Sequence, residues 1–253
     1  MYGKQVSAFA SNLACKETVA SNVMYNGPRA LVNWNDGMGG GNNISDNLMF
    51  NCVRETSDHG CFNSWDRVPF ITNATGTVGT DVLPTVMQHN FIISNYRSTW
   101  PIDHDDCSCY YHDTGNFCVY AGAKNFLGMS KVTAGNVYVD VDLNGMKACA
   151  VDDSPWSAGG SDADVYANNT CITGSGAMYH DSRCQTADLK DTVDNSFGNR
   201  FLSDDPARVG FACGGATLTL AEFQAKGFEK GSTAGPRPPV ADVIAMGEAV
   251  LGM

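Results

Sequence analysis

One short phrase of this sequence decides its fold: SNVMYN at residues 21–26 returns as DNLMFN at 46–51 and as HNFIISN at 89–95. Fainter copies follow as GNFCVY at 115–120 and GNVYV at 135–139. The leading asparagines of successive copies lie roughly 20 to 26 residues apart, except for one step of about 43, and this period is typical of a solenoid repeat. Each copy is too short to bury its own apolar face, but stacked copies would share one continuous core.

The residues within and around each copy favour strands over helices. Segments such as Phe91–Ile93 and Val137–Val139 consist of β-branched and aromatic residues, and Gly, Asn and Asp bracket them as turns require. No helical spacing of apolar residues lies between the copies. The pattern therefore predicts an all-β parallel β-helix solenoid, with the asparagines of successive coils stacked in a hydrogen-bonded ladder. The alternative is an antiparallel sandwich in which these asparagines only form turns.

The composition fits a turn-rich β protein with few charges. The chain has 253 residues, of which 43% are hydrophobic and 17% charged, with a net charge of −11. This acidic balance argues against nucleic acid or an anionic membrane as a partner. No apolar stretch has the length of a transmembrane helix, and we see no signal peptide.

Cysteines and glycosylation motifs indicate the compartment. An even number of cysteines, ten, is scattered along the chain without a Cys-x-x-Cys pair, which predicts several disulfides in a secreted or cell-wall protein. Sequons at Asn43, Asn73 and Asn168 agree with secretion. The alternative is a cytosolic protein with buried thiols, and the spacing does not determine the pairing.

The chain divides into a long repeat region and a short tail. We expect the solenoid to span residues 1–216, with a loop-rich stretch at 150–200, and a C-terminal cap to span 217–253. In the tail, Thr219–Gly227 has the signature of a capped helix, and Asp242–Leu251 has a second short helical pattern. A solenoid needs such a cap over its last coil.

Polar residues recur in the loops that follow each copy. Equivalent positions on successive coils would stack about 4.8 Å apart, so these residues would form one stripe down one face. The stripe would contain Asp36, Asp58, His59, Asp66, Arg67, Asp103, His104, Asp105, Asp106 and Lys131.

Three chemistries fit this stripe. Crowded carboxylates can supply the acid and the base that cleave a glycosidic bond, which makes Asp103, Asp105, Asp106 and His59 the catalytic candidates. The same three aspartates could instead hold calcium through oxygen ligands. A third possibility is elimination from a uronic acid, with His or Lys as the base and Arg67 neutralising the carboxylate. For any single residue, a turn-capping or buried structural role is the simpler alternative.

Residues around the catalytic candidates would position a sugar. Aromatic rings stack on sugar rings, and charged groups bind hydroxyl and carboxyl groups. The substrate-binding candidates are Asp36, Asp58, Trp65, Asp66, Arg67, Trp100 and Lys131.

Several stretches resemble a group of secreted right-handed parallel β-helix proteins that are placed near pectate-lyase-like carbohydrate-active enzymes. Asp103–Ser108 is similar to the group's Asp-x-Asp-Asp-Gly-Ser segment, and Lys124–Lys131 to its Lys-Asn…Gly-His-x-Lys segment. The other similar stretches are Asn26–Ala30, Asn35–Gly41, Arg54–Gly60, Phe62–Arg67 and Leu218–Gly227.

The resemblance implies a right-handed β-helix that processes polysaccharide, most simply as a glycoside hydrolase. A polysaccharide lyase or epimerase, with a basic cluster around Arg54, Arg67, Lys124 and Lys131, is one alternative. A non-catalytic protein that binds glycans or builds a matrix or filament is another.

Three residues depart from the pattern of this group. Cys61 stands where Pro is usual and Cys107 where Gly is usual, which implies a disulfide between neighbouring coils. Met129 replaces a usual His, which would impair catalysis if that His is essential. Relatives also have coils before the equivalent of Met1, so we expect an open N-terminal edge available to a partner or to self-association.

Overall fold

The structure is a computed structural model of the chain. It describes residues 7–12, 14–35, 40–65, 83–126, 128–143, 149–152, 164–174, 177–181, 196–213 and 216–253. Four of the residues singled out in the sequence, namely Asp36, Asp66, Arg67 and Asn73, lie outside these ranges.

The described residues form three sheets whose strands are almost all parallel, and we call them sheets A, B and C. Sheet A contains, in spatial order, β1 (Phe9–Asn12), β4 (Val32–Asn35), β7 (Gly60–Trp65), β10 (Trp100–Asp105), β13 (Ala123–Asn125), β16 (Ala150–Asp152), β19 (Ala177–Asp181), β22 (Gly210–Cys213) and β23 (Ala216–Thr219). Sheet B contains β2 (Thr18–Ala20), β5 (Asn43–Ser45), β8 (Thr85–Gln88), β11 (Tyr111–Thr114), β14 (Val132–Ala134), β17 (Val165–Ala167) and β20 (Ser196–Phe197). Sheet C contains β3 (Val23–Tyr25), β6 (Leu48–Phe50), β9 (Phe91–Ile93), β12 (Phe117–Val119), β15 (Val137–Val139), β18 (Thr170–Thr173), β21 (Arg200–Ser203) and β24 (Thr233–Pro236).

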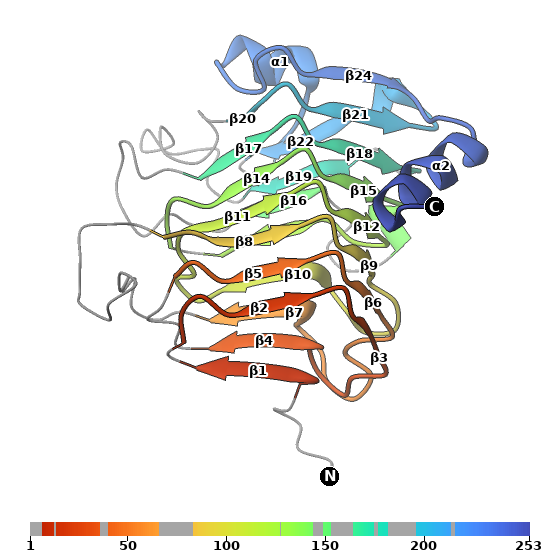
Figure 1. Cartoon of the computed structure of the whole chain (residues 1–253). Helices are drawn as coiled ribbons and strands as arrows, with labels where there is room; N and C mark the ends of the chain where they lie inside the picture. Colours follow the sequence, from red (N-terminus) through yellow and green to blue (C-terminus); the bar gives the residue numbers. More distant parts are fainter. Residues whose placement is uncertain are drawn as a thin grey trace.

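The chain visits the sheets in a fixed rotation. Over the first 21 strands, each strand of sheet A is followed by one of sheet B and one of sheet C, and we call such a set of three a rung. Figure 1 shows the rungs stacked in chain order from the N-terminal end to the C-terminal end. The expected all-β chain with parallel sheets is confirmed, and an antiparallel sandwich is excluded for these strands. Rungs also continue through β16–β20, so part of the stretch expected to be loop-rich forms strands.

The core lies between the three sheets. Side chains of a strand point alternately to its two faces, and every rung sends apolar ones inward. Sheet A contributes Trp34 and Phe62, sheet B contributes Met87, and sheet C contributes Ile92 and Tyr138, all nearly or completely buried. This stacking buries surface that no single rung could bury alone.

An asparagine ladder joins the rungs at the corner between sheets B and C. The backbone N–H and the side-chain Nδ2 of Asn47 both donate to Oδ1 of Asn90, at 3.1 and 2.9 Å. The same two bonds join each later step of the ladder. The ladder contains Asn22, Asn47, Asn90, Asn116, Asn136, Asn169 and Asn199. The ladder predicted from the first five asparagines is confirmed.

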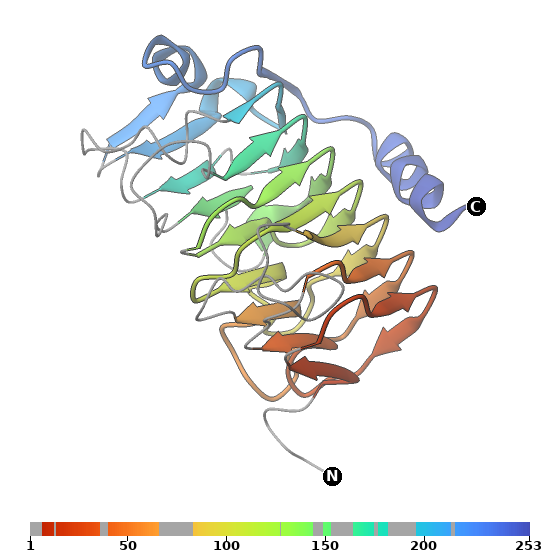
Figure 2. The same ribbon diagram turned by 60° about the vertical axis from the view of Figure 1, so that its left-hand side comes forward.

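The C-terminal tail covers the last rung and one side of sheet C. Helix α1 (Leu220–Ala225) begins with the expected capping box between Thr219 and Glu222, and its Phe223 stacks on Phe211 of β22 with ring centroids 4.7 Å apart. Helix α2 (Val240–Leu251) lies beside sheet C (Figures 1 and 2), where its apolar residues pack on strands β9 to β21. Both expected helices are thus present. Two 3-10 turns, η1 (Val141–Leu143) and η3 (Pro206–Arg208), complete the helical elements of the described residues.

Two disulfides occur within the described residues, and they correct one expectation. Cys52 bonds with Cys61, and Cys149 bonds with Cys171. The implied pairing of Cys61 with Cys107 is therefore wrong, and Cys107 carries a free thiol. Cys52 and Cys61 flank the loop between sheets C and A, so that bond closes a local loop.

Candidate functional site

The strand register places one polar side chain from each of four neighbouring strands in a row across sheet A. Asn33 of β4 pairs with Asn63 of β7. Asp103 of β10 pairs with Asn63 on one side and with Lys124 of β13 on the other. Because side chains alternate along a strand and the neighbouring Phe62 belongs to the core, this row lies on the outer face of sheet A.

Lys124 bridges two aspartates of β10. Its Nζ lies 2.8 Å from Oδ1 of Asp103 and 2.9 Å from Oδ1 of Asp105. The two contacting carboxylate oxygens are therefore at most about 6 Å apart, a limit that admits the ~5–5.5 Å between the carboxyl groups of retaining glycosidases. We call Asp103, Lys124 and Asp105 the Asp–Lys–Asp cluster.

The two aspartates of the cluster differ in their surroundings. Asp103 is completely buried, and this burial raises the pKa of its carboxyl group to about 7 even though Lys124 opposes the shift. Burial alone would lower the pKa of Lys124, but the two aspartates raise it above its usual value. The side chain of Asp105 is 28% exposed. The cluster thus combines a carboxyl group that exchanges its proton near neutral pH with a second one that solvent reaches.

Arg29 and His59 lie beside the row. Nη1 of Arg29 donates to Oδ1 of Asn33 at 3.0 Å, and its Nη2 lies 3.4 Å from Nδ1 of His59. Burial, reinforced by the charge of Arg29, lowers the pKa of His59 to about 4, so the ring is neutral at pH 7. A neutral imidazole can accept a proton, which makes His59 a second titratable group at this site.

Aromatic rings surround the cluster. The ammonium group of Lys124 lies 5.8 Å from the ring centroid of Trp100 and 5.4 Å from that of Phe126, within the range of cation–π attraction. Trp100 is buried, so its ring supports Lys124 and offers no surface to a sugar. Trp65 is partly exposed and stands next to Asp105 in the strand register.

A second polar network lies inside the molecule, behind the same strands. Oγ of Ser64 lies 2.7 Å from Nδ1 of His104, and Nε2 of His104 lies 2.8 Å from Oδ2 of Asp113. Ser108 Oγ lies 2.8 Å from Ser64 Oγ. The contacts run from Ser64 through His104 to Asp113, in the order of a Ser-His-Asp catalytic triad. These residues are 0–2% exposed and lie inside the molecule, so no substrate reaches them. The network satisfies buried polar groups between sheets A and B.

The structure brings some of the expected site residues together. Asp103 and Asp105 meet at Lys124, and His59 lies next to them beside Arg29. Asp58 is exposed beside His59. The catalytic and binding roles of these residues remain predictions.

Two residues of the expected stripe lie elsewhere. His104 points into the core, because it follows Asp103 on the strand and must face the opposite side. Lys131 is 1% exposed and lies 2.9 Å from Asp164, while its Nζ donates to the carbonyl of Ser108 at 3.1 Å. Lys131 connects loops near β14 and is not accessible to a polysaccharide.

The three aspartates expected to hold calcium do not converge. Oδ2 of Asp106 accepts a hydrogen bond from Nε1 of Trp65 at 2.8 Å, and Lys124 occupies the space between Asp103 and Asp105. The described residues contain no group of three or more His, Cys, Asp or Glu side chains able to hold a metal ion. The ammonium group of Lys124 supplies positive charge between the two aspartates.

Counting along the sequence missed Arg29, Asn33 and Asn63. The distance from a ladder asparagine to the polar row differs from rung to rung because the loops before sheet A differ in length. A better signal is the polar residue that directly follows an apolar, inward-facing one, as in Val32-Asn33, Phe62-Asn63, Ile102-Asp103 and Ala123-Lys124.

The two described sequons differ in access. Asn168 is exposed in the turn between β17 and β18. Asn43 is partly buried in β5, and its Nδ2 donates to Oγ of Ser45 at 3.2 Å. If the protein is glycosylated, Asn168 is therefore the more accessible acceptor.

No family model, curated protein or solved structure matches this chain. Among the helices of the described ranges, none has the length and apolar character needed to cross a membrane. Function must therefore be argued from the site itself.

Proposed function

We propose that the chain forms a right-handed parallel β-helix that processes an extracellular polysaccharide on the outer face of sheet A. Every described strand except β23 pairs with the third strand along the chain, and this pattern supports the solenoid. Crossover connections between parallel strands of one sheet are right-handed in about 98% of cases, and this preference supports a right-handed β-helix. Two disulfides fit an oxidising compartment.

We assign glycoside hydrolysis to the Asp–Lys–Asp cluster. The observation that carries this proposal is the close carboxyl pair in which burial raises the pKa of Asp103 to about 7. Hydrolysis needs one group that protonates the leaving oxygen and one that attacks the anomeric carbon or activates water. Asp103 suits the first role and Asp105, which is open to solvent, suits the second.

The burial of Asp103 sets a condition on this mechanism. Its carboxyl group meets the glycosidic oxygen only if the side chains above it move when a substrate binds. Lys124 lies against both aspartates and is itself only 7% exposed, so it belongs to the groups that must shift. Lys124 would then also stabilise negative charge on Asp105 during the reaction.

The test combines two assays on a panel of plant and algal polysaccharides. Release of reducing ends reports hydrolysis, and ultraviolet absorbance reports unsaturated uronates. We expect reducing ends without unsaturated product, and a loss of roughly 10²-fold or more in Asp105→Asn and in Asp103→Asn. Asp46→Asn, an exposed carboxylate far along the chain from the cluster, is the matched control and should keep full activity. Turnover that survives Asp105→Asn would refute the assignment.

A lyase or epimerase is the second candidate, and a specific observation favours it. The ring of His59 is neutral at pH 7 and lies beside the cation Arg29, with the charge of Lys124 also acting on it, and elimination needs a neutral base next to cations that neutralise the uronate carboxylate. Unsaturated product that disappears in His59→Ala would establish this reading. No turnover by a well-folded protein would leave a glycan-binding or structural role.

A further inference from the structure

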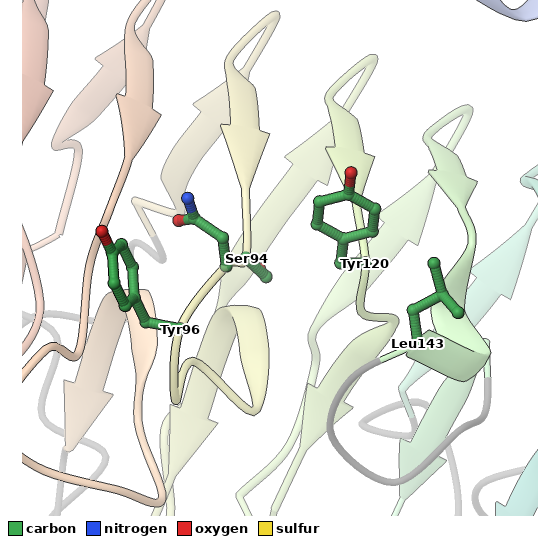
Figure 3. Close-up of a pocket in the computed structure, with 5 residues that line it drawn as sticks. Ser94, Tyr96, Tyr120 and Leu143 are labelled. Atoms are coloured by element: carbon green, nitrogen blue, oxygen red, sulfur yellow. The ribbon is translucent and has the colours of Figure 1, made fainter.

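A shallow pocket lies at the corner where the chain passes from sheet C to sheet A. Five residues from three successive rungs line it, and its volume is about 280 Å³. They are Ser94, Asn95, Tyr96, Tyr120 and Leu143. Figure 3 shows Tyr96, Tyr120 and Leu143 following one another across neighbouring rungs. None of the five carries a charge.

The backbone at both tyrosines is unusual. Tyr96 has φ = 60° and Tyr120 has φ = 79°, in the left-handed region that bulky side chains rarely adopt. Tyr120 directly follows a strand of sheet C, and the equivalent positions of other rungs hold Asn26, Asn51 and Asp140, also with positive φ. Asn and Asp enter this region far more easily. Tyr120 thus stands where other rungs place Asn or Asp, and Tyr96 has the same left-handed backbone two residues beyond the equivalent position of its own rung.

The hydrophobic core does not account for the two rings. Tyr96 is 58% exposed, and Tyr120 is only partly buried, so neither ring serves the core. The guanidinium group of Arg54 lies over the ring of Tyr96, 5.4 Å from its centroid, which steadies the ring. Strained backbone that presents exposed aromatic rings is a feature of binding sites.

From this geometry we infer that the corner pocket binds an uncharged stretch of glycan. Tyrosine rings offer an apolar face to the C–H face of a sugar, and their hydroxyl groups hydrogen-bond to sugar hydroxyls. None of the five lining residues is charged, and the nearby guanidinium group of Arg54 is engaged with the ring of Tyr96, so the lining suits a neutral ligand. The volume is just below the usual range for small-molecule pockets, so the site holds a short part of a longer chain.

This site is separate from the Asp–Lys–Asp cluster, and it rests on the proposed function only for the class of ligand. The pocket is built at the sheet C to sheet A corner, whereas the cluster lies within strands β10 and β13. Its role would be to hold a polysaccharide chain against the surface, which raises the local substrate concentration without taking part in bond cleavage.

The test measures retention in native gels that contain a soluble neutral polysaccharide, with laminarin, galactomannan and hydroxyethylcellulose as probes. The variants are Tyr96→Asn and Tyr120→Asn, alone and combined. Two other rungs place asparagine at the Tyr120 position, and asparagine also adopts the left-handed backbone of Tyr96 more easily than tyrosine does, so these variants should fold with an unchanged or higher melting temperature. We expect the double variant to bind at least roughly tenfold more weakly than the wild type.

Two controls separate this inference from the proposed hydrolysis. Tyr25→Thr removes an exposed tyrosine outside the pocket and should leave retention unchanged. Asp105→Asn should be retained like the wild type even though it is catalytically impaired. If Asp105→Asn is retained by the polysaccharide gel and the tyrosine variants are not, the result supports glycan binding in the pocket, whether or not any turnover is found. Equal retention of the wild type and the double variant, or retention of neither by any of the three probes, overturns it.

Discussion

The carboxyl group of Asp103 makes the stability of the protein depend on pH. Burial raises its pKa to about 7, whereas an aspartate in the unfolded chain titrates near 3.9. Between these values the folded protein holds a proton that the unfolded chain has released. The Asp103 carboxyl group therefore lowers the unfolding free energy as pH rises from about 4 to about 7, by at most about 1.4 kcal/mol per pH unit. Above pH 7 it makes the unfolding free energy no more dependent on pH.

Replacement of Asp103 by asparagine should remove this slope. We expect urea unfolding between pH 4.5 and 8 to show a weaker pH dependence in Asp103→Asn than in the wild type. The difference between the two curves should reach its plateau near pH 7, where the wild-type carboxyl group becomes charged. Parallel curves would mean that Asp103 is not the buried group that titrates in this range.

Single asparagines of the ladder should differ sharply in their contribution to stability. Asn116 accepts two hydrogen bonds from Asn90 and donates to Asn136 and to the carbonyl of Met87, all of them buried. Asn116→Ala leaves several of these groups without partners, and we expect a loss of about 2–5 kcal/mol in unfolding free energy. Asn22 is exposed at the first step, so Asn22→Ala should lose less than about 1 kcal/mol. Urea denaturation of both variants checks this, and similar losses would contradict it.

At the scale of elements, the attachment of α2 to sheet C depends on one glycine. A Cβ atom on Gly247 would lie 2.8 Å from the ring of Phe91 and 3.2 Å from that of Phe117. Gly247→Val should therefore lift α2 from the sheet, even though valine has the higher helix propensity. We expect faster proteolysis in the segment before Val240, with the rest of the fold intact.

The exposed face of the same helix provides the control for this prediction. Ala245 is exposed, so Ala245→Val changes the helix without touching the sheet. Its proteolysis rate should match that of the wild type. If Gly247→Val is equally resistant, the contact of α2 with Phe91 and Phe117 does not hold the helix in place.

Elements with a periodic signal could be predicted from the sequence, and the others could not. The ladder asparagines recur before strands of constant length. The spacing of the asparagines from Asn22 to Asn136 therefore predicted both the strands that follow them and the stacked ladder between sheets B and C. Asn169 and Asn199 have the same role, but the intervals of 33 and 30 residues before them fit neither the period of roughly 20 to 26 residues nor twice that period. The site was predicted only in part. Side chains alternate along β10, so Asp103 points outward and the next residue, His104, points inward. A residue count through loops of unequal length is not accurate to one position and cannot tell these two residues apart.

The whole molecule is an array in which each rung contacts its neighbours, so its stability should be local. The ladder ends at a buried carboxylate: Nδ2 of Asn199 donates to Oε2 of Glu229 at 2.9 Å, and Ser232 donates to the same oxygen. Glu229 is completely buried and follows α1, the helix that covers the last rung. The tail therefore closes the core and the ladder together.

Loss of this terminating carboxylate should loosen one end of the array and leave the middle intact. We expect Glu229→Ala to speed backbone hydrogen exchange in β20, β21 and β24, because Nδ2 of Asn199 loses one of its two acceptors and the end of the ladder frays. Exchange in β8, β9 and β11, several rungs away, should stay at the wild-type rate. Asn116→Ala, in contrast, should speed exchange in those central strands. Hydrogen exchange read by mass spectrometry distinguishes the two patterns, and a uniform increase in Glu229→Ala would show that the rungs open as one cooperative unit.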